Sequence, residues 1–317
     1  MTVTIAHQYD DALGARVAES VPDGIEFLAL GASPDSGWAV PARAEILLIN
    51  QNSAAVGLNR QMKRPPGWPF NLKWVHLRST GIDKYPDWVF EVPQVTVTRG
   101  GYATPIAEYV LAAMLSLAKH IPAIWARERD DWHGHELGRL AGETLGIVGF
   151  GEIGKAIARR ALAFDMKVLA TRRNPGPSGM DGVDIVALET LLARSDHIVV
   201  ATPLTADTRG LLDGRTLPMI RPGAHLINIG RGPVIDNTAL RKALDAGLGA
   251  VTLDVTDPEP LPEGHWLYHH PKVRISPHIS GNAPDTEAVI TRFFRDNLGR
   301  YLSGQGLSGR VDPDARY

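Results

Sequence analysis

The sequence predicts an α/β protein that contains two doubly wound parallel sheets. Short apolar runs alternate with helical stretches along most of the 317 residues, and this alternation is typical of parallel strands joined by crossover helices. The strands fall into two blocks, separated by a long helical run at 104–120 that has Pro105 near its start and Pro122 just beyond its end. We expect this helix to link two domains.

Five strands are expected in the first block and six in the second. The first set is 3–6, 25–30, 45–49, 74–77 and 95–98, and the second is 144–149, 167–171, 197–201, 225–229, 249–254 and 273–276. Six parallel strands suggest a dinucleotide-binding sheet. A last helical run at 285–302 has no obvious place in that sheet, so we expect it to return to the first. The predicted domains are therefore 1–104 with 285–317, and 105–284.

The composition excludes several classes of protein. With 44% hydrophobic and 21% charged residues the chain has enough apolar material for two cores. A net charge of -2 offers no basic face to nucleic acid or to an anionic membrane, and no apolar run approaches the ~20 residues of a membrane span. The chain has no cysteine, which excludes disulfides and thiolate metal sites. We expect a cytoplasmic protein without a metal, a nucleic-acid partner or a signal peptide.

A glycine pattern predicts the cofactor site. The segment TLGIVGFGEIGKAIARR places Gly149, Gly151 and Gly154 between an apolar strand and an amphipathic helix. In that context the first glycine makes a tight turn, the second lets the backbone approach a pyrophosphate, and the third lets helix and strand pack closely. Backbone N–H groups near Glu152 and Ile153 would then point at the phosphates from a helix N-terminus. The alternative is a glycine turn without a ligand.

Two arginines predict which dinucleotide is bound. Enzymes that use NAD carry Asp or Glu at the end of the second strand, about 20 residues past the glycines, to bind the ribose hydroxyls. Here that strand ends in Arg172 and Arg173. A planar cationic fork suits a 2'-phosphate, so we predict NADP(H) as the preferred cofactor, with NAD(H) as the alternative. The competing interpretation is a pair of solvated surface arginines.

Three further segments follow predicted strands of the second block, where open α/β sheets bind their ligands. They are NIGRGPVID with Arg231, DVTDPEPLP with Asp254 and Glu259, and SPHISG with His278. From about residue 80 onward, these segments, the glycine pattern, STGID, TPIAEYVLAAML and ATPLTADTRGLLD resemble the D-isomer-specific 2-hydroxyacid dehydrogenases, above all their glyoxylate and hydroxypyruvate reductases. The resemblance implies a homodimeric, NADPH-dependent reductase of small 2-keto acids. It also implies a Rossmann cofactor domain inserted into a flavodoxin-like substrate domain.

The chemistry of a 2-keto acid agrees with the three residues that the resemblance makes catalytic. Arg231 can hold the carboxylate and polarise the ketone oxygen. His278 can protonate that oxygen when hydride adds to C2. Glu259 can hydrogen-bond the imidazole and set its tautomer. Similar formate dehydrogenases have an amide at the position of Glu259, so the acid favours a keto acid over formate as substrate.

The resemblance assigns the remaining site residues. Asp254 matches the residue that binds the nicotinamide carboxamide. The other matches on the cofactor side are Thr202, Pro203, Thr208, Ile229 and Gly230, together with Arg231, His278 and Gly281. Substrate contacts are expected from Arg231 and His278, from backbone N–H groups of Ser79, Thr80 and Gly81, and from the segment 99–102.

Three alternatives stay open at this point. Co-repressors of the same fold keep the dehydrogenase site, so a cofactor-sensing binding protein is the second hypothesis. A larger or phosphorylated acid would need extra cations, for which the candidates are Arg78, Lys84 and Arg99. In some relatives the region that here holds Trp125, Trp132, His133 and His135 reaches the active site of a dimer partner; the alternative role of these tryptophans is packing.

Overall fold

The chain divides into two compact units. The computed structural model describes residues 3–31, 33, 36–50, 58–134, 136–174 and 176–312. Unit 1 consists of Met1–Tyr102 and Ala283–Tyr317, and unit 2 consists of Ala103–Asn282. The sequence places the two junctions after residues 104 and 284, and the structure places them after residues 102 and 282.

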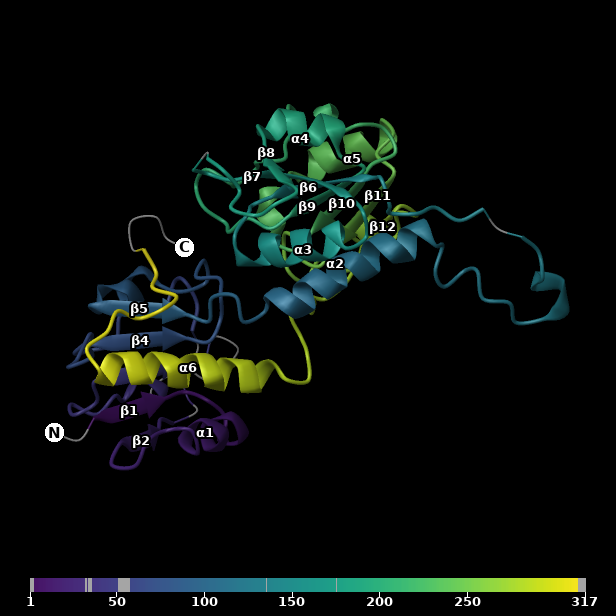
Figure 1. Ribbon diagram of the computed structural model, residues 1–317. Helices are drawn as coiled ribbons and strands as arrows, with labels where there is room; N and C mark the ends of the chain where they lie inside the picture. The colour runs from purple at the N-terminus through teal and green to yellow at the C-terminus, as the bar shows by residue number, and fades with distance from the viewer. Residues whose placement is uncertain are drawn as a thin grey trace. The chain divides into compact units, whose positions relative to one another are not determined.

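Unit 1 contains a five-stranded parallel sheet in the order β2-β1-β3-β4-β5. Its strands are β1 (Thr4–His7), β2 (Glu26–Ala29), β3 (Ile46–Ile49), β4 (Trp74–Leu77) and β5 (Gln94–Val97). The strand order is that of flavodoxin-like folds, as predicted. Helices α1 (Asp11–Ala18) and α6 (Thr286–Leu302) belong to this unit (Figure 1).

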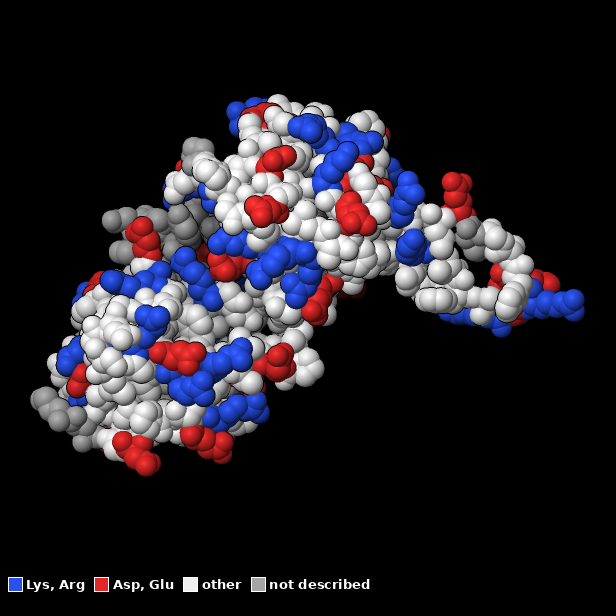
Figure 2. Space-filling view, in the orientation of Figure 1, with Lys and Arg blue, Asp and Glu red and all other residues white. Residues whose placement is uncertain are grey.

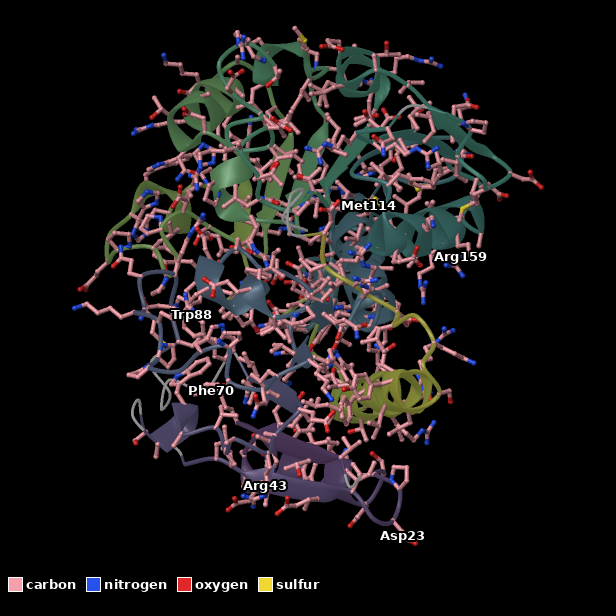
Figure 3. The ribbon with its side chains drawn as sticks, turned by 90° about the vertical axis from the view of Figure 1, so that its left-hand side faces the viewer. Asp23, Arg43, Phe70, Trp88, Met114 and Arg159 are labelled. Carbon is pink, nitrogen blue, oxygen red and sulfur yellow. The ribbon has the colours of Figure 1, made fainter. Side chains whose placement is uncertain are left out.

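The sheet of unit 1 is packed on both faces. On one face α6 contributes Phe294 and Leu298 to a buried cluster with Ile5 and Trp74. The other face includes three tryptophans, Trp38, Trp68 and Trp88, whose rings meet edge to face at centroid distances of 4.7 to 5.9 Å. Trp88 and its neighbour in this layer, Phe70, are labelled in Figure 3. Because both faces are covered, ligands can reach this sheet only at its strand ends.

Unit 2 contains a seven-stranded parallel sheet in the order β12-β11-β10-β9-β6-β7-β8. The strands are β6 (Thr144–Val148), β7 (Lys167–Thr171), β8 (Val183–Ile185), β9 (His197–Val200), β10 (His225–Asn228), β11 (Ala250–Leu253) and β12 (Val273–Ile275). The helices are α2 (Ala103–Ala118), α3 (Glu152–Leu162), α4 (Leu188–Arg194) and α5 (Asn237–Asp245). In Figure 1 α4 and α5 cover one face of the sheet, and α3 lies with α2 on the other.

The sequence prediction of six strands in this sheet was one short. The missed strand, β8, has only three residues, lies at the sheet edge beside β7, and exposes Asp184 at its centre. A run of that length carries no apolar periodicity to detect. With β8 included, the first six strands have the Rossmann order 3-2-1-4-5-6, and β12 adds a seventh next to β11.

Short 3-10 helices occupy several connections of both units. They are η1 (Ser36–Trp38), η3 (Asp87–Glu91), η4 (Arg129–Asp131), η5 (Leu217–Met219), η6 (Gly232–Val234) and η7 (Trp266–Tyr268). No helix in the described part of the chain is both long and apolar enough to traverse a membrane. On the face drawn in Figure 2, positive and negative side chains are interspersed over each unit rather than gathered by sign.

The connection between α2 and β6 is an extended arm that leaves the body of unit 2 and carries η4 near its far end (Figure 1). Trp125 on this arm is 61% exposed and Trp132 is 85% exposed. Core packing therefore does not account for these two tryptophans, whereas it does account for those of unit 1. His135, which was grouped with them in the sequence analysis, lies outside the described residues.

Buried histidines are held neutral inside both units. In unit 1 burial lowers the pKa of His76 to about 3. In unit 2 burial, followed by the charges of His197 and Arg274, lowers the pKa of His225 to about 3. Burial also lowers the pKa of His197, although its hydrogen bond to Glu143 opposes the shift. In the unfolded chain these side chains would titrate near 6.5.

We expect acid to destabilise the fold through these histidines. Between pH 6.5 and about 3 the unfolded chain binds protons that the folded chain excludes, so the free energy of unfolding falls as the pH falls. Each such histidine contributes up to about 1.4 kcal/mol per pH unit. Urea unfolding from pH 6.5 to 5.0 should therefore show a shallower pH dependence for His225→Gln than for wild type. The exposed His269→Gln is the control, and equal slopes for His225→Gln and wild type would contradict the assignment.

Candidate active site

The three glycines of the turn after β6 differ in the space around them. Gly149 has φ +104°, and a Cβ on it would lie 2.8 Å from the backbone of Ala201. A Cβ on Gly154 would lie 2.5 Å from the carbonyl oxygen of Gly149. Gly151 differs, because a Cβ there would meet nothing within 4 Å. The first and third glycines thus serve packing, and the second faces open space.

The residues around Gly151 fit a dinucleotide phosphate. Gly151 is the N-cap of α3 and supplies no side-chain cap, so N–H groups of the first turn, which includes Glu152 and Ile153, are available to an anion. At the end of β9, the buried Oγ1 of Thr202 has no hydrogen-bond partner within the described part of the chain. Because buried hydroxyls are ordinarily paired, this atom is a second sign of a ligand.

Neighbouring loops complete the floor of this region. A Cβ on Gly230 would lie 2.7 Å from the carbonyl oxygen of Thr202, so the turns after β9 and β10 touch through their backbones. Ile229, which precedes Gly230, is buried. The exposed Pro203 follows Thr202, and its carbonyl accepts a 2.6 Å hydrogen bond from Oγ1 of Thr208. That contact makes Thr208 a support for the loop.

The two arginines after β7 make different contacts. Arg172 donates from Nη2 to the carbonyl of Pro177 at 2.6 Å, and its buried Nε has no partner among the described residues. Arg173 is exposed and forms a 3.1 Å ion pair with Asp207. Asp207, which sequence reasoning missed, lies in the loop after β9 beside Thr208. An isolated exposed aspartate in a loop is common, so nothing around Asp207 in the sequence marked it as part of the site.

The acid–base pair comes from neighbouring strands. Nδ1 of His278, after β12, lies 2.6 Å from Oε1 of Glu259, after β11. With the proton assigned to Nδ1 as donor to the carboxylate, Nε2 is left to face a ligand. The two side chains are 38% and 31% exposed, so the pair is accessible to a ligand.

An unusual backbone conformation presents the imidazole. His278 has φ +54°, a left-handed geometry that is uncommon outside glycine and asparagine. Its own N–H donates to the carbonyl oxygens of Asp254 at 2.8 Å and Ser276 at 3.0 Å. These two hydrogen bonds offset the strain of the left-handed conformation.

Asp254 is buried beneath that turn. Its Oδ1 accepts hydrogen bonds from Oγ of Ser276 at 2.6 Å and from N of Ile279 at 2.9 Å, and its Oδ2 accepts from N of Ser280 at 3.1 Å. The carboxylate thus holds the loop that carries His278 and ends at Gly281. The carboxamide contact that the sequence predicts for Asp254 would have to use acceptor capacity left on Oδ2.

Tyr109 extends this network into α2. Its hydroxyl lies 2.6 Å from Oγ of Ser276, and burial raises its pKa. Sequence reasoning missed both residues, since Ser276 reads as the end of a strand and Tyr109 as one aromatic residue in an amphipathic helix. Only the pairing of distant segments shows that they support the histidine loop.

Arg231 is placed by close packing of two loops. It is the N-cap of η6, and its Nη1 donates to the carbonyl of Gly230 at 2.8 Å. A Cβ on the following Gly232 would collide with the carbonyl oxygen of Thr256, so the loops after β10 and β11 approach without room for a side chain. The three catalytic candidates follow three adjacent strands: Arg231 follows β10, Glu259 follows β11 and His278 follows β12.

The predicted substrate loop belongs to unit 1. Ser79, Thr80 and Gly81 follow β4. Oγ of Ser79 donates to the carbonyl of Gly81 at 2.8 Å, and Oγ1 of Thr80 donates to the carbonyl of Thr98 at 3.0 Å. Both hydroxyls are therefore used within the unit.

A family comparison agrees with this geometry. The model of the D-isomer specific 2-hydroxyacid dehydrogenase family, NAD binding domain, matches residues 111–280. The chain belongs to this family. The matched region spans the glycine turn and all three strand-end segments that carry the catalytic candidates of the dehydrogenase.

Individual relatives of the dehydrogenase extend beyond that region. It is 31% identical over 276 residues to a glycerate dehydrogenase of Methylorubrum extorquens. The aligned region covers 83% of this chain and 84% of the relative. It is 37% identical over 221 residues to glyoxylate/hydroxypyruvate reductase B of Pectobacterium atrosepticum, 66% of this chain and 68% of the relative. Among solved structures, a D-isomer specific 2-hydroxyacid dehydrogenase from Xanthobacter autotrophicus Py2, in complex with NADPH and MES, aligns over 100% of both chains with a TM-score of 0.81 and 27% identity.

Proposed function

We propose that this 2-hydroxyacid dehydrogenase reduces small 2-keto acids of the glyoxylate or hydroxypyruvate type, with NADPH as the preferred reductant. The observation that carries the proposal is the 2.6 Å contact between His278 and Glu259. Both residues follow the carboxyl ends of strands in the sheet that also holds the glycine turn. A histidine oriented by a carboxylate is the arrangement that proton transfer to a ketone oxygen requires.

Each catalytic residue has one task in this proposal. The bound cofactor supplies the hydride that reduces C2. The guanidinium of Arg231 holds the carboxylate of the acid and stabilises the negative charge that develops on the ketone oxygen. Nε2 of His278 delivers the proton to that oxygen. Glu259 keeps the proton of Nδ1 in place and stabilises the charged imidazole before transfer.

The loop at residues 79–81 offers backbone donors in unit 1. The hydroxyls of Ser79 and Thr80 are tied to carbonyls of their own unit. We therefore assign substrate binding in this loop to the backbone N–H groups of Ser79, Thr80 and Gly81, which suit a carboxylate oxygen.

The cofactor preference rests on Arg172 and Arg173. Arg172, whose Nε pairs with no residue in the described ranges, and the exposed Arg173 both lie just past β7, where the ribose of a dinucleotide is recognised. The solved relative from Xanthobacter autotrophicus was crystallised with NADPH. Both observations favour a 2'-phosphate over a 2'-hydroxyl.

We expect kcat/KM to be at least about tenfold higher for NADPH than for NADH, since a charge-assisted hydrogen bond contributes on the order of 1.5–3 kcal/mol. Absorbance at 340 nm, followed with glyoxylate, hydroxypyruvate, pyruvate and phenylpyruvate, measures both cofactors. The double variant Arg172→Ala with Arg173→Ala should remove the preference. Arg159→Ala, an exposed arginine of the same unit (Figure 3), is the control. A higher kcat/KM for NADH would refute the preference, and no turnover with any acid would favour a cofactor sensor.

We also propose a homodimer. The support is the arm between α2 and β6, because the large exposed apolar surfaces of Trp125 and Trp132 suit burial against a second copy. Light scattering, which gives the mass in solution, tests this assembly.

A further inference from the structure

Unit 1 has a polar cluster at the carboxyl ends of its strands that the reaction scheme does not use. Tyr9 follows β1, Asn50 follows β3, and Arg78 follows β4. In the order β2-β1-β3-β4-β5 the chain reverses direction between β1 and β3. Open α/β sheets bind ligands at such a reversal. Tyr9 follows one of its two strands, and Arg78, which follows the next strand β4, reaches Asn50 after the other at 3.5 Å.

Two atoms of the cluster are buried without partners. Tyr9 is 6% exposed, and its hydroxyl has no hydrogen-bond partner in the described residues. The same is true of Nε of Arg78. Leaving a buried donor unpaired costs stability, so folded proteins seldom do it except where a ligand or a water supplies the missing partner. Two such atoms at the carboxyl ends of strands of one sheet, after β1 and β4, point to a ligand that accepts hydrogen bonds.

The surroundings of Arg78 define its chemistry. Its Nη1 lies 3.5 Å from the neutral amide oxygen of Asn50, and its carbonyl accepts a bond from the hydroxyl of Tyr102 at 3.3 Å. Burial raises the pKa of Tyr9, Tyr85 and Tyr102, and the charge of Arg78 opposes the rise in all three. One half-buried guanidinium therefore lies among three phenols that remain protonated. Tyr102 donates to Arg78 and Tyr85 pairs with Ser79, which leaves the hydroxyl of Tyr9 as the donor for a ligand.

This set fits a carboxylate better than a phosphate. A guanidinium fork and a phenol hydroxyl can satisfy one planar carboxylate. A phosphate would call for more positive charge, yet the two other cations considered for a larger acid, Lys84 and Arg99, are exposed, and Arg99 donates to the carbonyl of Arg310 at 3.3 Å. Arg78 alone of the three belongs to the polar cluster.

We propose that Arg78 and Tyr9 form a carboxylate-binding subsite of unit 1. The inference rests on the proposed function, because it takes the carboxylate to be that of a 2-keto or 2-hydroxy acid. Two sources share this chemistry. One is the carboxylate next to C2, common to all substrates. The other is a second carboxylate at C3 or beyond, which would make dicarboxylic acids a substrate class of this dehydrogenase.

The test measures binding without turnover. The full chain is titrated by calorimetry with glycolate and with malate, neither of which can be oxidised unless an oxidised cofactor is added. We expect Arg78→Met and Tyr9→Phe each to raise the Kd of malate about tenfold or more, as expected for a lost hydrogen bond to a charged group. A similar loss for glycolate assigns the subsite to the carboxylate next to C2, and a loss confined to malate assigns it to the second carboxylate.

Two controls separate binding from folding. Arg16→Met removes the same charge from an exposed position on α1 and should leave both Kd values unchanged. Tyr9→Phe removes a buried hydroxyl that pairs with none of the residues the structure describes, so its Tm should be equal to or above that of wild type while its affinity falls. A purely structural Tyr9 would give no change in affinity.

Three outcomes bear on the two proposals separately. Unchanged Kd values in Arg78→Met, or no binding of either acid by wild type, overturn the subsite even if the enzyme reduces glyoxylate. Weakened binding in a chain that reduces no acid keeps the subsite and overturns the proposed function. Weakened binding together with a raised KM for the matching keto acid supports both.

Discussion

Replacing His278 by glutamine is expected to lower kcat by about 10²- to 10⁴-fold, the usual contribution of a positioned general acid, while NADPH still binds. Nε2 of His278 is the atom free to donate a proton, because Nδ1 is engaged by Glu259 at 2.6 Å. Glutamine keeps a polar side chain but cannot deliver a proton near neutral pH. Steady-state kinetics with glyoxylate and a fluorescence titration with NADPH measure the two quantities.

The backbone at this position calls for a second variant. Since His278 has φ +54°, glutamine could distort the turn as well as remove the acid. His278→Asn avoids this ambiguity, because asparagine accepts left-handed geometry more readily. Both variants should lose kcat to a similar extent, whereas the exposed His269→Gln should not. A near-normal kcat in His278→Asn would show that another group donates the proton.

Replacing Arg231 by methionine is expected to lower kcat/KM by about 10³-fold or more. The loss of a stabiliser of the developing oxyanion costs about 10² to 10³, and the loss of a carboxylate ligand adds about 10-fold or more. Arg231→Lys should recover only part of the loss, because an ammonium lacks the planar fork that binds a carboxylate bidentately. Steady-state kinetics with glyoxylate and hydroxypyruvate give the values.

The variant at Arg231 needs a check on the turn that it begins. Its Nη1 donates to Gly230, and its carbonyl accepts from Asn228 at 3.0 Å. The hydrogen bond from Asn228 to the main-chain carbonyl survives the substitution, so Tm should change little. Arg209→Met, an exposed arginine of the same unit, is the matched control. If Arg231→Met and Arg209→Met had equal kcat/KM values, the carboxylate would have to be held elsewhere.

Local patterns were sufficient for most elements and for the residues with strong chemistry. Glycines that need positive φ or close packing, such as Gly149, leave a mark in the sequence, and a buried parallel strand reads as a continuous apolar run. The sequence pointed to His278 and Glu259 through the family resemblance and their places after predicted strands, and the structure places their side chains 2.6 Å apart. That distance depends on the adjacency of β11 and β12, which no local pattern contains.

Two of the residues that sequence reasoning missed depend on a contact between distant segments. Ser276 and Tyr109 act through hydrogen bonds between segments more than 160 residues apart, so neither has a neighbour in sequence that would mark it. The edge strand β8 is too short for periodicity to detect. Arg78 was one of three candidate cations. What distinguishes it is the burial of its Nε and a Tyr9 hydroxyl that has no partner within the described part of the chain.

By itself the sequence determined the α/β class and the glycine turn, because backbone sterics and apolar periodicity act over a few residues, while the three strand-end residues were assigned through the resemblance to the family. Only the tertiary structure decided how Asp254 is used. Its carboxylate is buried under the loop that carries His278 and binds that loop's own N–H groups. A buried charge must find partners wherever the fold brings donors, and those partners are set by the packing of β11 against β12.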